Sequence, residues 1–247
     1  MGASSSSATG GGRGGGTEIR VLCSGAFKAA FEQLAPAFES ASGHKVHAAW
    51  GSSVAGAQTS IPSRLERGEP VDVVIMAGEG LDRLIAAGRI APGGRVDLVR
   101  SGIGVAVRSG APRPDLSSTE AFTRALMAAR SLAHSSSASG IYIKAMLQRL
   151  GVATALGDRI RQVEGEPVGR VVARGEAEIG FQQMSELLPV KGIDIVGPLP
   201  AELQHVTVFS AGLAAHAREP EAARSLVAYL KSPAAAPVIR QSGMEPA

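Results

Sequence analysis

Short segments of serine, glycine and alanine are the part of this sequence best suited to chemistry. They are Ser24-Gly25-Ala26, Gly51-Ser52-Ser53 and the stretch from Ser135 to Gly140. Each follows an apolar run and precedes a helical pattern, so each is predicted to be a turn from a strand into a helix. Free N–H groups and the dipole at a helix start attract anions. One such turn is an ordinary helix cap, but several in one chain predict a cleft that binds a small anion.

Some titratable side chains could add acid–base chemistry to this cleft. Lys28 lies at the start of the first predicted helix, where it either attracts a carboxylate or is an ordinary surface lysine. His134 precedes the serine-rich stretch, and His205 opens a long predicted strand. Glu186 follows an apolar run at 179–181, at a strand end or in a solvated loop. No motif fixes the role of any of them, so the catalytic base stays unassigned.

Motifs for several other chemistries are missing. The glycines near Gly78-Glu79-Gly80 and Gly93-Gly94 lack the strand, spacing and helix of a nucleotide-binding loop, and no G-x-S-x-G elbow occurs. Cys23 is the only cysteine, which excludes an intramolecular disulfide. The five histidines do not combine with cysteines or carboxylates at metal-ligand spacing. We therefore expect neither a metal ion nor a cofactor.

The composition favours a small-molecule partner over a membrane or a nucleic acid. The chain has 247 residues, of which 45% are hydrophobic and 4% aromatic. Its 25 basic and 22 acidic residues give a net charge of +3, and the basic ones are scattered. No apolar run approaches the ~18 residues of a membrane span. Scattered charge with few aromatics also differs from a nucleic-acid-binding surface.

The elements that must position these residues alternate along the chain. Helical spacing of apolar residues predicts helices between short apolar runs, the clearest of them at 220–230. The apolar runs predict strands at 19–22, 46–50, 71–76, 103–107 and 205–213. Strands that alternate with helices predict βαβ units, so the fold class is α/β with a largely parallel sheet.

The N-terminal residues 1–16 are rich in serine and glycine. Such a segment has little to bury, so we expect a disordered leader. It has no apolar core of a secretory signal. A removed signal, a misplaced start or a cytoplasmic protein would each account for this, and the sequence does not choose between them.

Several segments share their residue order with a known family. The most specific runs from Ser139 to Gly151. The others are IRVLCSGA (19–26), WGSS (50–53), GEPVDVVI (68–75), RGEAEIG (174–180) and YLKSPAA (229–235). On these segments, residues 18–243 resemble the periplasmic molybdate-binding protein family, which belongs to the type II solute-binding proteins.

The resemblance implies the two-lobed type II periplasmic-binding-protein fold. In that fold each lobe is a mixed, mostly parallel sheet flanked by helices, and two crossing strands join the lobes around the ligand. Mapped onto this chain, one lobe comprises 17–102 and 210–247, and the other comprises 108–205. The crossings are 103–107 and 206–211.

The resemblance also implies a ligand site, from which this sequence departs. The family holds an oxyanion with hydroxyls and backbone N–H groups. Its first-turn serine corresponds to Ala26, its tyrosine to Gln183, and a valine that offers its N–H to a position near Gly165. The second-turn serines are kept as Ser52 and Ser53. Because two hydroxyls are missing, we expect a small organic acid rather than molybdate.

The expected ligand-binding set combines one positive charge with hydroxyl, amide and backbone N–H groups. It consists of Ser24, Gly25, Ala26, Lys28, Ser52, Ser53, Ser137, Ser139, Gly140 and Gln183.

Two functions from different classes fit these expectations. The favoured one is a monomeric, periplasmic or extracytoplasmic solute-binding protein that captures a small anion and passes it to a membrane transporter. The alternative is an enzyme, because one branch of the superfamily isomerises aconitate by removing and returning a proton. The tracts Gly25–Lys28 and Gln183–Glu186 are unlike the molybdate pattern and keep that branch open. Whether the protein is an enzyme is therefore undecided from the sequence.

Overall fold

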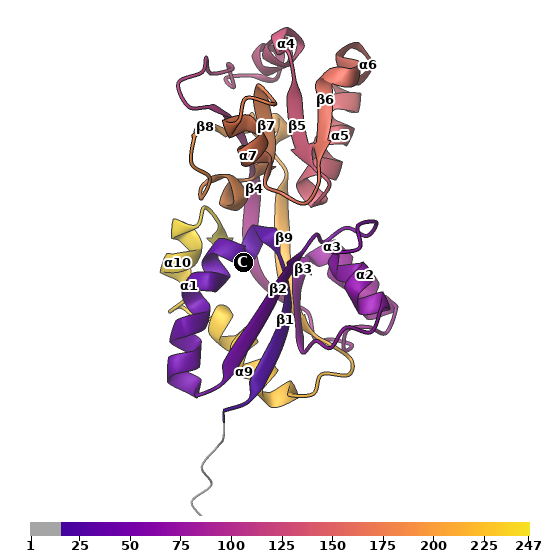
Figure 1. Cartoon of the computed structure of the whole chain (residues 1–247), viewed down its shortest axis with the longest axis vertical. Coiled ribbons are helices and arrows are strands. Elements are labelled where there is room, and N and C mark those ends of the chain that lie inside the picture. The colour runs from indigo at the N-terminus through magenta and orange to yellow at the C-terminus, as the bar shows by residue number, and fades with distance from the viewer. Residues whose placement is uncertain (1–15) are drawn as a thin grey trace, which may run out of the picture.

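Two lobes are stacked along the long axis of the molecule, and two long strands run between them. The computed structural model describes residues 16–247, so the expected leader lies outside the described residues apart from Gly16. The connecting strands are β4 (Val96–Arg108) and β9 (Val206–Leu213). Figure 1 shows them between the helices of the lower and upper lobes. The two-lobed α/β fold predicted from the sequence is thus present.

The lower lobe contains both ends of the described chain. Its elements are β1 (Glu18–Ser24), α1 (Gly25–Ser42), β2 (Lys45–Gly51), α2 (Ile61–Glu66), β3 (Val73–Ala77), α3 (Gly78–Ala86), α9 (Pro220–Leu230), α10 (Ala236–Gln241) and β10 (Glu245–Pro246).

The upper lobe is one continuous stretch of chain between the two connecting strands. Its elements are α4 (Thr119–Ala128), β5 (Leu132–Ser135), α5 (Ala138–Arg149), α6 (Ala153–Leu156), the 3-10 helix η1 (Gly157–Arg159), β6 (Ile160–Val163), α7 (Val168–Ala173), β7 (Ile179–Gln183), α8 (Met184–Leu187), β8 (Ile193–Pro198) and the 3-10 helix η2 (Ala201–Leu203).

Helix α1 illustrates how local sequence sets an element. The Ser24 hydroxyl caps its start by accepting a hydrogen bond from Ala26 N–H. Phe27, Phe31 and other apolar residues at helical spacing are buried against the sheet. Gly43, at φ 77°, ends the helix in the left-handed conformation, which glycine adopts without strain. The serine cap, the helical spacing of apolar residues and the closing glycine therefore account for the position of α1.

The strands form mixed sheets whose order is β2-β1-β3-β9-β4-β7-β5-β6, with β10 and β8 also paired to β4. In the lower lobe β1 is parallel to β2 and β3, and in the upper lobe β5 is parallel to β6 and β7. The connecting strands run antiparallel to their neighbours. The carboxyl ends of the parallel strands of both lobes therefore face the space between the lobes.

Strand β4 changes partner where it leaves the lower lobe. Residues 96–102 pair with β9, and residues 103–107 pair with β7. The sequence indicated only the second half, because the first half carries alternating charged residues instead of a continuous apolar run. The residue limits of the lobes and crossings remain a prediction.

Amide side chains hold the backbone at this crossing. Gln204 accepts a hydrogen bond from Ile103 N–H at 2.9 Å and donates one to the Ile103 carbonyl at 3.0 Å. The Gln183 amide lies 3.2 Å from the Thr207 hydroxyl. When its oxygen accepts from Thr207, its nitrogen can donate to Ser101 Oγ at 2.8 Å. These bonds satisfy buried polar groups where the sheet passes from one lobe to the other.

Each lobe has its own apolar core. Phe27 belongs to the cluster under α1 and α9, and Leu81 to the cluster under α2 and α3. In the upper lobe Phe122 and Phe181 meet edge to face with ring centroids 6.1 Å apart. Burying a side chain of this size contributes roughly 1.5–3 kcal/mol. The cleft between the lobes is thus framed by two independently packed units.

Among residues 16–247, no helix combines the length and apolarity that a bilayer span requires.

A buried carboxylate ties the lower lobe together. Asp72 is 1% exposed and accepts hydrogen bonds from Arg20 N–H, Arg218 N–H and Glu219 N–H. It therefore joins β1 to the start of α9, and Asp72 and Glu219 are themselves 147 residues apart in the sequence. Hydrogen bonds to a charged acceptor are stronger than neutral ones, and their loss leaves buried donors unpaired.

Replacing this carboxylate should destabilise the protein strongly. We expect Asp72→Ala to lower the free energy of unfolding by about 3 kcal/mol, because several N–H groups lose their acceptor. Urea unfolding measures the effect, and the exposed Asp158 supplies the control Asp158→Ala, expected to change stability by less than about 0.5 kcal/mol. Equal effects of the two substitutions would contradict this role of Asp72.

Candidate functional site

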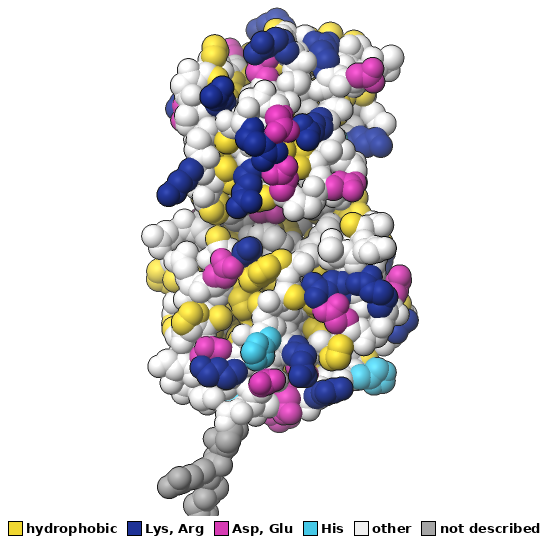
Figure 2. Space-filling model, viewed as in Figure 1, with side chains coloured by type: hydrophobic (Ala, Val, Ile, Leu, Met, Phe, Trp, Pro, Cys, Tyr) yellow, Lys and Arg dark blue, Asp and Glu magenta, His cyan; other side chains and the backbone are white. Residues whose placement is uncertain are grey.

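The serine-rich turns meet in a hollow between the lobes. This hollow, which we call the serine hollow, has a volume of about 420 Å³. Its walls include Ser24 and Ser52 from the lower lobe and Ser135 and Ser137 from the upper lobe. Figure 2 shows the hollowed band between the lobes, with Lys and Arg side chains on the upper lobe above it. The predicted convergence of strand-to-helix turns at one cleft is therefore present in the structure.

Glu186 brings a carboxyl group into the serine hollow from the upper lobe. It belongs to α8, which begins directly after β7. Its Oε1 lies 2.9 Å from the point that a Cβ on Gly25 would occupy, so the carboxyl almost touches the start of α1. A Cβ at this position would require the flexible end of the Glu186 side chain to shift. The glycine therefore lets the carboxyl lie against the start of α1.

The pKa of Glu186 is raised by its surroundings. Burial raises the pKa from 4.5 to about 7, and a hydrogen bond from the Gln182 amide acts in the opposite direction. Desolvation disfavours a charged carboxylate, which explains the sign. Gln182 also accepts a hydrogen bond from Val168 N–H at 2.8 Å, so it is held in place. A carboxyl group that titrates near neutral pH can take and return protons.

Lys28 lines the serine hollow close to Glu186. Its ammonium lies 3.7 Å from Glu32 Oε1 and 5.3 Å from the centre of the Trp50 ring. These contacts hold the lysine loosely, since its side chain remains 47% exposed. The structure thus brings together Lys28 and Glu186, two of the candidates that the sequence could not rank.

The serines of the upper lobe form a hydroxyl cluster at the start of α5. Ser135 Oγ lies 2.7 Å from Ser137 Oγ and 3.1 Å from Ser139 Oγ. Ser139 is fully buried, whereas Ser135 and Ser137 reach the hollow. A Cβ added at position 140 would collide with the Ser135 carbonyl, so a glycine is needed there for α5 to pack against the end of β5. Ser137 is therefore exposed to a ligand, and Ser139 and Gly140 support it.

The serines of the second turn have different surroundings. Ser52 lines the serine hollow, and its hydroxyl accepts a hydrogen bond from Val54 N–H. Ser53 is 4% exposed and accepts one from Ala77 N–H at 3.0 Å, next to a neighbouring hollow. Ser52 is thus the member of the pair that can face a ligand in the serine hollow.

Some of the residues expected from the sequence lie away from the serine hollow. Gln183 is 1% exposed and bound to Thr207 at the crossing, while its neighbour Gln182 lines the hollow instead. Strand alternation explains the difference, because adjacent residues of β7 face opposite sides of the sheet. Ala26 is 2% exposed within the core of α1. His134 is 4% exposed and lines a separate hollow of the upper lobe. Gln183 and His134 therefore do not join Glu186.

His205 lines a neighbouring hollow in the same cleft. Its ring stacks on Tyr142 with centroids 4.6 Å apart. Arg83 and Gly78 lie in the wall of this hollow. Gly78 follows β3 and begins α3, so a strand and a helix do flank this glycine. Gly78 and Gly80 still lack the glycine spacing of a nucleotide-binding loop.

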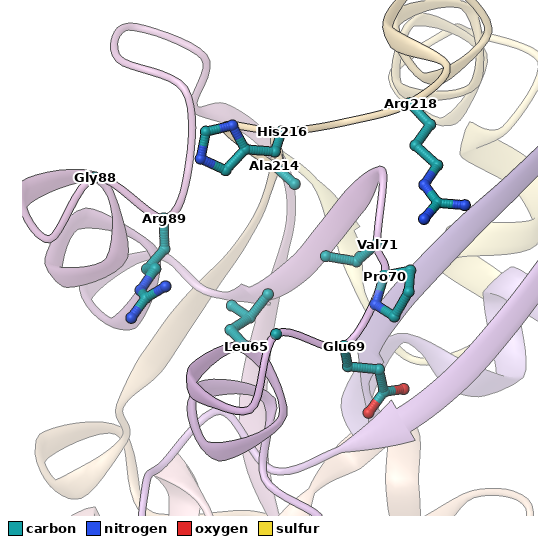
Figure 3. Close-up of a pocket in the computed structure, with 10 residues that line it drawn as sticks. Leu65, Glu69, Pro70, Val71, Gly88, Arg89, Ala214, His216 and Arg218 are labelled. Atoms are coloured by element: carbon teal, nitrogen blue, oxygen red, sulfur yellow. The ribbon is translucent and has the colours of Figure 1, made fainter.

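Two further hollows contain residues that the sequence did not indicate. A hollow of about 320 Å³ on the lower lobe is lined by Arg89, His216 and Arg218, but by none of the expected site residues (Figure 3). A recess beside the serine hollow contains Arg170 and Lys191 of the upper lobe. No sequence motif marks these cations, since Arg170 lies in α7 and Lys191 lies in the turn before β8. Within the described part of the chain, no cluster of three His, Cys, Asp or Glu side chains could hold a metal ion.

Comparisons with known proteins agree with this architecture. The model of a family described as bacterial extracellular solute-binding protein matches residues 19–245. An aconitate isomerase from Pseudomonas sp is 46% identical over 231 residues, which are 93% of this chain and 88% of that protein.

Solved structures show the same fold at lower identity. The periplasmic molybdate-binding protein of Azotobacter vinelandii has a TM-score of 0.74 and 24% identity over 92% of this chain and 98% of its own. The sulfate-binding protein SubI of Mycobacterium tuberculosis has a TM-score of 0.76 and 17% identity over 93% of this chain and 87% of its own. These likenesses confirm the periplasmic-binding-protein fold expected from the sequence.

The raised pKa of Glu186 should make stability depend on pH. Between about 4.5 and about 7 the folded protein keeps a proton that the unfolded chain has lost. The Glu186 contribution is therefore complete below pH 4.5 and is lost as the pH rises through 7. We expect Glu186→Gln, which resembles the protonated form, to stabilise the protein relative to wild type at pH 8 but not at pH 4.5. Urea unfolding across this range, with Glu164→Gln as control, measures the difference, and a pH-independent difference would argue against it.

Proposed function

The chain belongs to the bacterial extracellular solute-binding protein family, and from this premise we propose that it isomerises a small unsaturated tricarboxylate of the aconitate class between its lobes. The observation that carries the proposal is the Glu186 carboxyl, which lies in the cleft against Gly25 with a pKa of about 7. The 46% identity to an aconitate isomerase over 93% of the chain supports the same substrate class.

The reaction moves a double bond along a three-carbon chain. A base removes a proton from the CH2 carbon, and the electron pair of that C–H bond becomes an allylic anion shared with the carboxylates. The same proton is then returned to the CH carbon at the other end of the allylic system. One bond to hydrogen breaks and one forms, so no oxidant, reductant or cofactor is consumed. The chemistry needs a single base and donors for the developing charge.

Glu186 has the properties of such a base. Its pKa near 7 means that a large fraction is ionised at neutral pH, while the protonated form remains acidic enough to return the proton. Its position at the junction of two lobes lets closure around the substrate exclude water. Lys28 and His205 lie in the cleft, but Lys28 is solvated beside Glu32 and His205 is stacked on Tyr142.

Donors for the developing negative charge surround the serine hollow. Helix α1 begins beside Ser24 and α5 begins beside Ser137, and the first turn and dipole of a helix favour a negative charge. The hydroxyls of Ser52 and Ser135 add neutral donors. Neutral donors stabilise a carboxylate whose charge increases in the transition state without holding the ground state too tightly.

A solute receptor is the second candidate, and the family membership favours it. In this alternative the same cleft captures an organic acid, closes, and delivers it to a membrane transporter without turnover. A periplasmic location, a monomeric state and a preference for organic acids over molybdate accompany this alternative as proposals. The hydroxyls that the sequence lacks at Ala26 and Gln183 support the preference.

Removal of the Glu186 carboxylate should abolish turnover without abolishing binding. We expect wild-type protein to interconvert cis- and trans-aconitate, and Glu186→Gln to lower kcat by ~100-fold to ~10,000-fold, as for loss of a general base. In wild type kcat/KM should rise with pH around a midpoint near 7, because the base acts when deprotonated. Proton NMR of the two isomers follows the reaction.

The control for this experiment is Glu164→Gln, which removes another carboxylate from the wall of the same hollow. We expect Glu164→Gln to retain wild-type turnover within about threefold. Full activity of Glu186→Gln would refute the role of Glu186. Tight aconitate binding by pure wild-type protein with no interconversion would favour the receptor.

A ligand panel should separate the classes of anion. We expect calorimetry to detect binding of trans-aconitate at micromolar concentration and much weaker binding of molybdate, tungstate and sulfate. The physical reason is that a tricarboxylate engages both the serine hollow and the neighbouring cations, whereas a tetrahedral oxyanion fills one hollow only. Nanomolar molybdate binding would overturn the preference for an organic acid.

A further inference from the structure

A second recess adjoins the serine hollow within the cleft and is rich in positive charge. It has a volume of about 510 Å³ and is open to solvent between the lobes. Lys28 enters it from α1, Arg170 from α7, and Lys191 from the turn that precedes β8. We call it the basic recess. Lys28 belongs to the lower lobe and the other cations belong to the upper lobe.

The three cations share the basic recess with the carboxyl groups of Glu32 and Glu186. Lys28 lies 3.7 Å from Glu32. Neither Arg170 nor Lys191 forms an ion pair with any residue between 16 and 247, although many surface arginines of the upper lobe do. Closure of the lobes would bring these like charges nearer to one another, which is unfavourable unless an anion lies between them.

Ser185 provides independent evidence for a ligand in the basic recess. Its side chain is 2% exposed and lies in the wall of the recess. Within residues 16–247 its hydroxyl is buried with no hydrogen-bond partner. A buried hydroxyl without a partner costs ~1–3 kcal/mol. A carboxylate in the recess would accept its hydrogen bond and remove this cost.

The basic recess and the serine hollow share a wall. Gly25, Lys28, Pro167 and Glu186 line both of them. A ligand that extends from one into the other would pass its middle carbons beside the Glu186 carboxyl. Its carboxylates would then lie on both sides of the base, among hydroxyls on one side and cations on the other.

We propose that the basic recess, formed by Lys28, Arg170, Lys191 and Ser185, is a subsite for one carboxylate of the bound tricarboxylate. It orients the substrate so that its reacting carbon faces Glu186, and it selects tricarboxylates over dicarboxylates. This subsite rests on the proposed function for its ligand class. It also couples binding to closure, because the anion offsets the repulsion between cations of opposite lobes.

The test measures binding of a tricarboxylate that cannot react. Tricarballylate has the three carboxylates but no double bond, and glutarate and methylsuccinate each lack one of those carboxylates. Calorimetry gives the three dissociation constants, and fluorescence of Trp50, the only tryptophan, reports events beside Lys28. Arg170→Gln and Lys191→Gln remove one charge each. Arg130→Gln is the matched control, because its side chain is 91% exposed and lies outside the recess.

We expect Arg170→Gln and Lys191→Gln each to weaken tricarballylate binding about tenfold, as for loss of one charged hydrogen bond. The preference for tricarballylate over the weaker dicarboxylate should fall by a similar factor. Arg130→Gln should stay within twofold of wild type. Unchanged tricarballylate binding in both recess variants, or an equal loss in Arg130→Gln, would overturn the subsite.

Ser185→Ala tests the unpaired hydroxyl separately. If the hydroxyl serves the ligand, the variant should unfold at the same temperature as wild type or higher, while its affinity for tricarballylate falls about threefold to tenfold. A loss of thermal stability with unchanged affinity would show that the hydroxyl is structural and would count against the subsite.

The subsite and the isomerase activity can fail independently. If tricarballylate binding depends on Arg170 but wild type does not interconvert aconitate, the isomerase activity is refuted and the subsite is supported. If wild type interconverts aconitate but the recess variants bind tricarballylate normally, the subsite is refuted and the isomerase activity is supported. A wild-type protein that binds no tricarballylate would overturn the subsite.

Discussion

The chemistry of the cleft depends on the close approach of Glu186 in one lobe to Gly25 in the other. The carboxyl oxygen lies 2.9 Å from the position of a Cβ that Gly25 does not have. The approach buries the carboxyl, and burial raises its pKa to about 7. A Cβ at position 25 would require the end of the Glu186 side chain to shift. A glycine that looks like a helix-start residue in the sequence is therefore what lets this carboxyl lie against α1.

Two strands, β4 and β9, connect the lobes that form this contact. Strand β4 changes its partner from β9 to β7 at the crossing, and Gln204 holds the backbone there through both of its amide atoms. Because each lobe has a separate apolar core, rotation about the crossing leaves both cores intact. Such a rotation would change the distance between Glu186 and Gly25 without unfolding either lobe.

Charge is arranged unevenly around Glu186. On one side Ser52, Ser135 and Ser137 offer neutral donors, and on the other Arg170 and Lys191 offer full charges. A receptor for one oxyanion needs only the first kind of surface. An enzyme that handles several carboxylates gains from both, because charges position the distant groups while neutral donors respond to the charge that develops at the reacting end.

The sequence by itself determined the α/β class and the strand-to-helix turns at Ser24, Ser52 and Ser135, because apolar periodicity and turn chemistry are local properties. It also indicated Lys28 and Glu186, but it did not rank them above His134 and His205. Only the tertiary structure decided that these two meet, that Gln182 rather than Gln183 faces the cleft, and that His134 lies elsewhere. The side of a strand that a residue faces, the burial that raises a pKa, and the gathering of Arg170 and Lys191 all depend on contacts between segments far apart in the chain. Local sequence patterns do not specify such contacts.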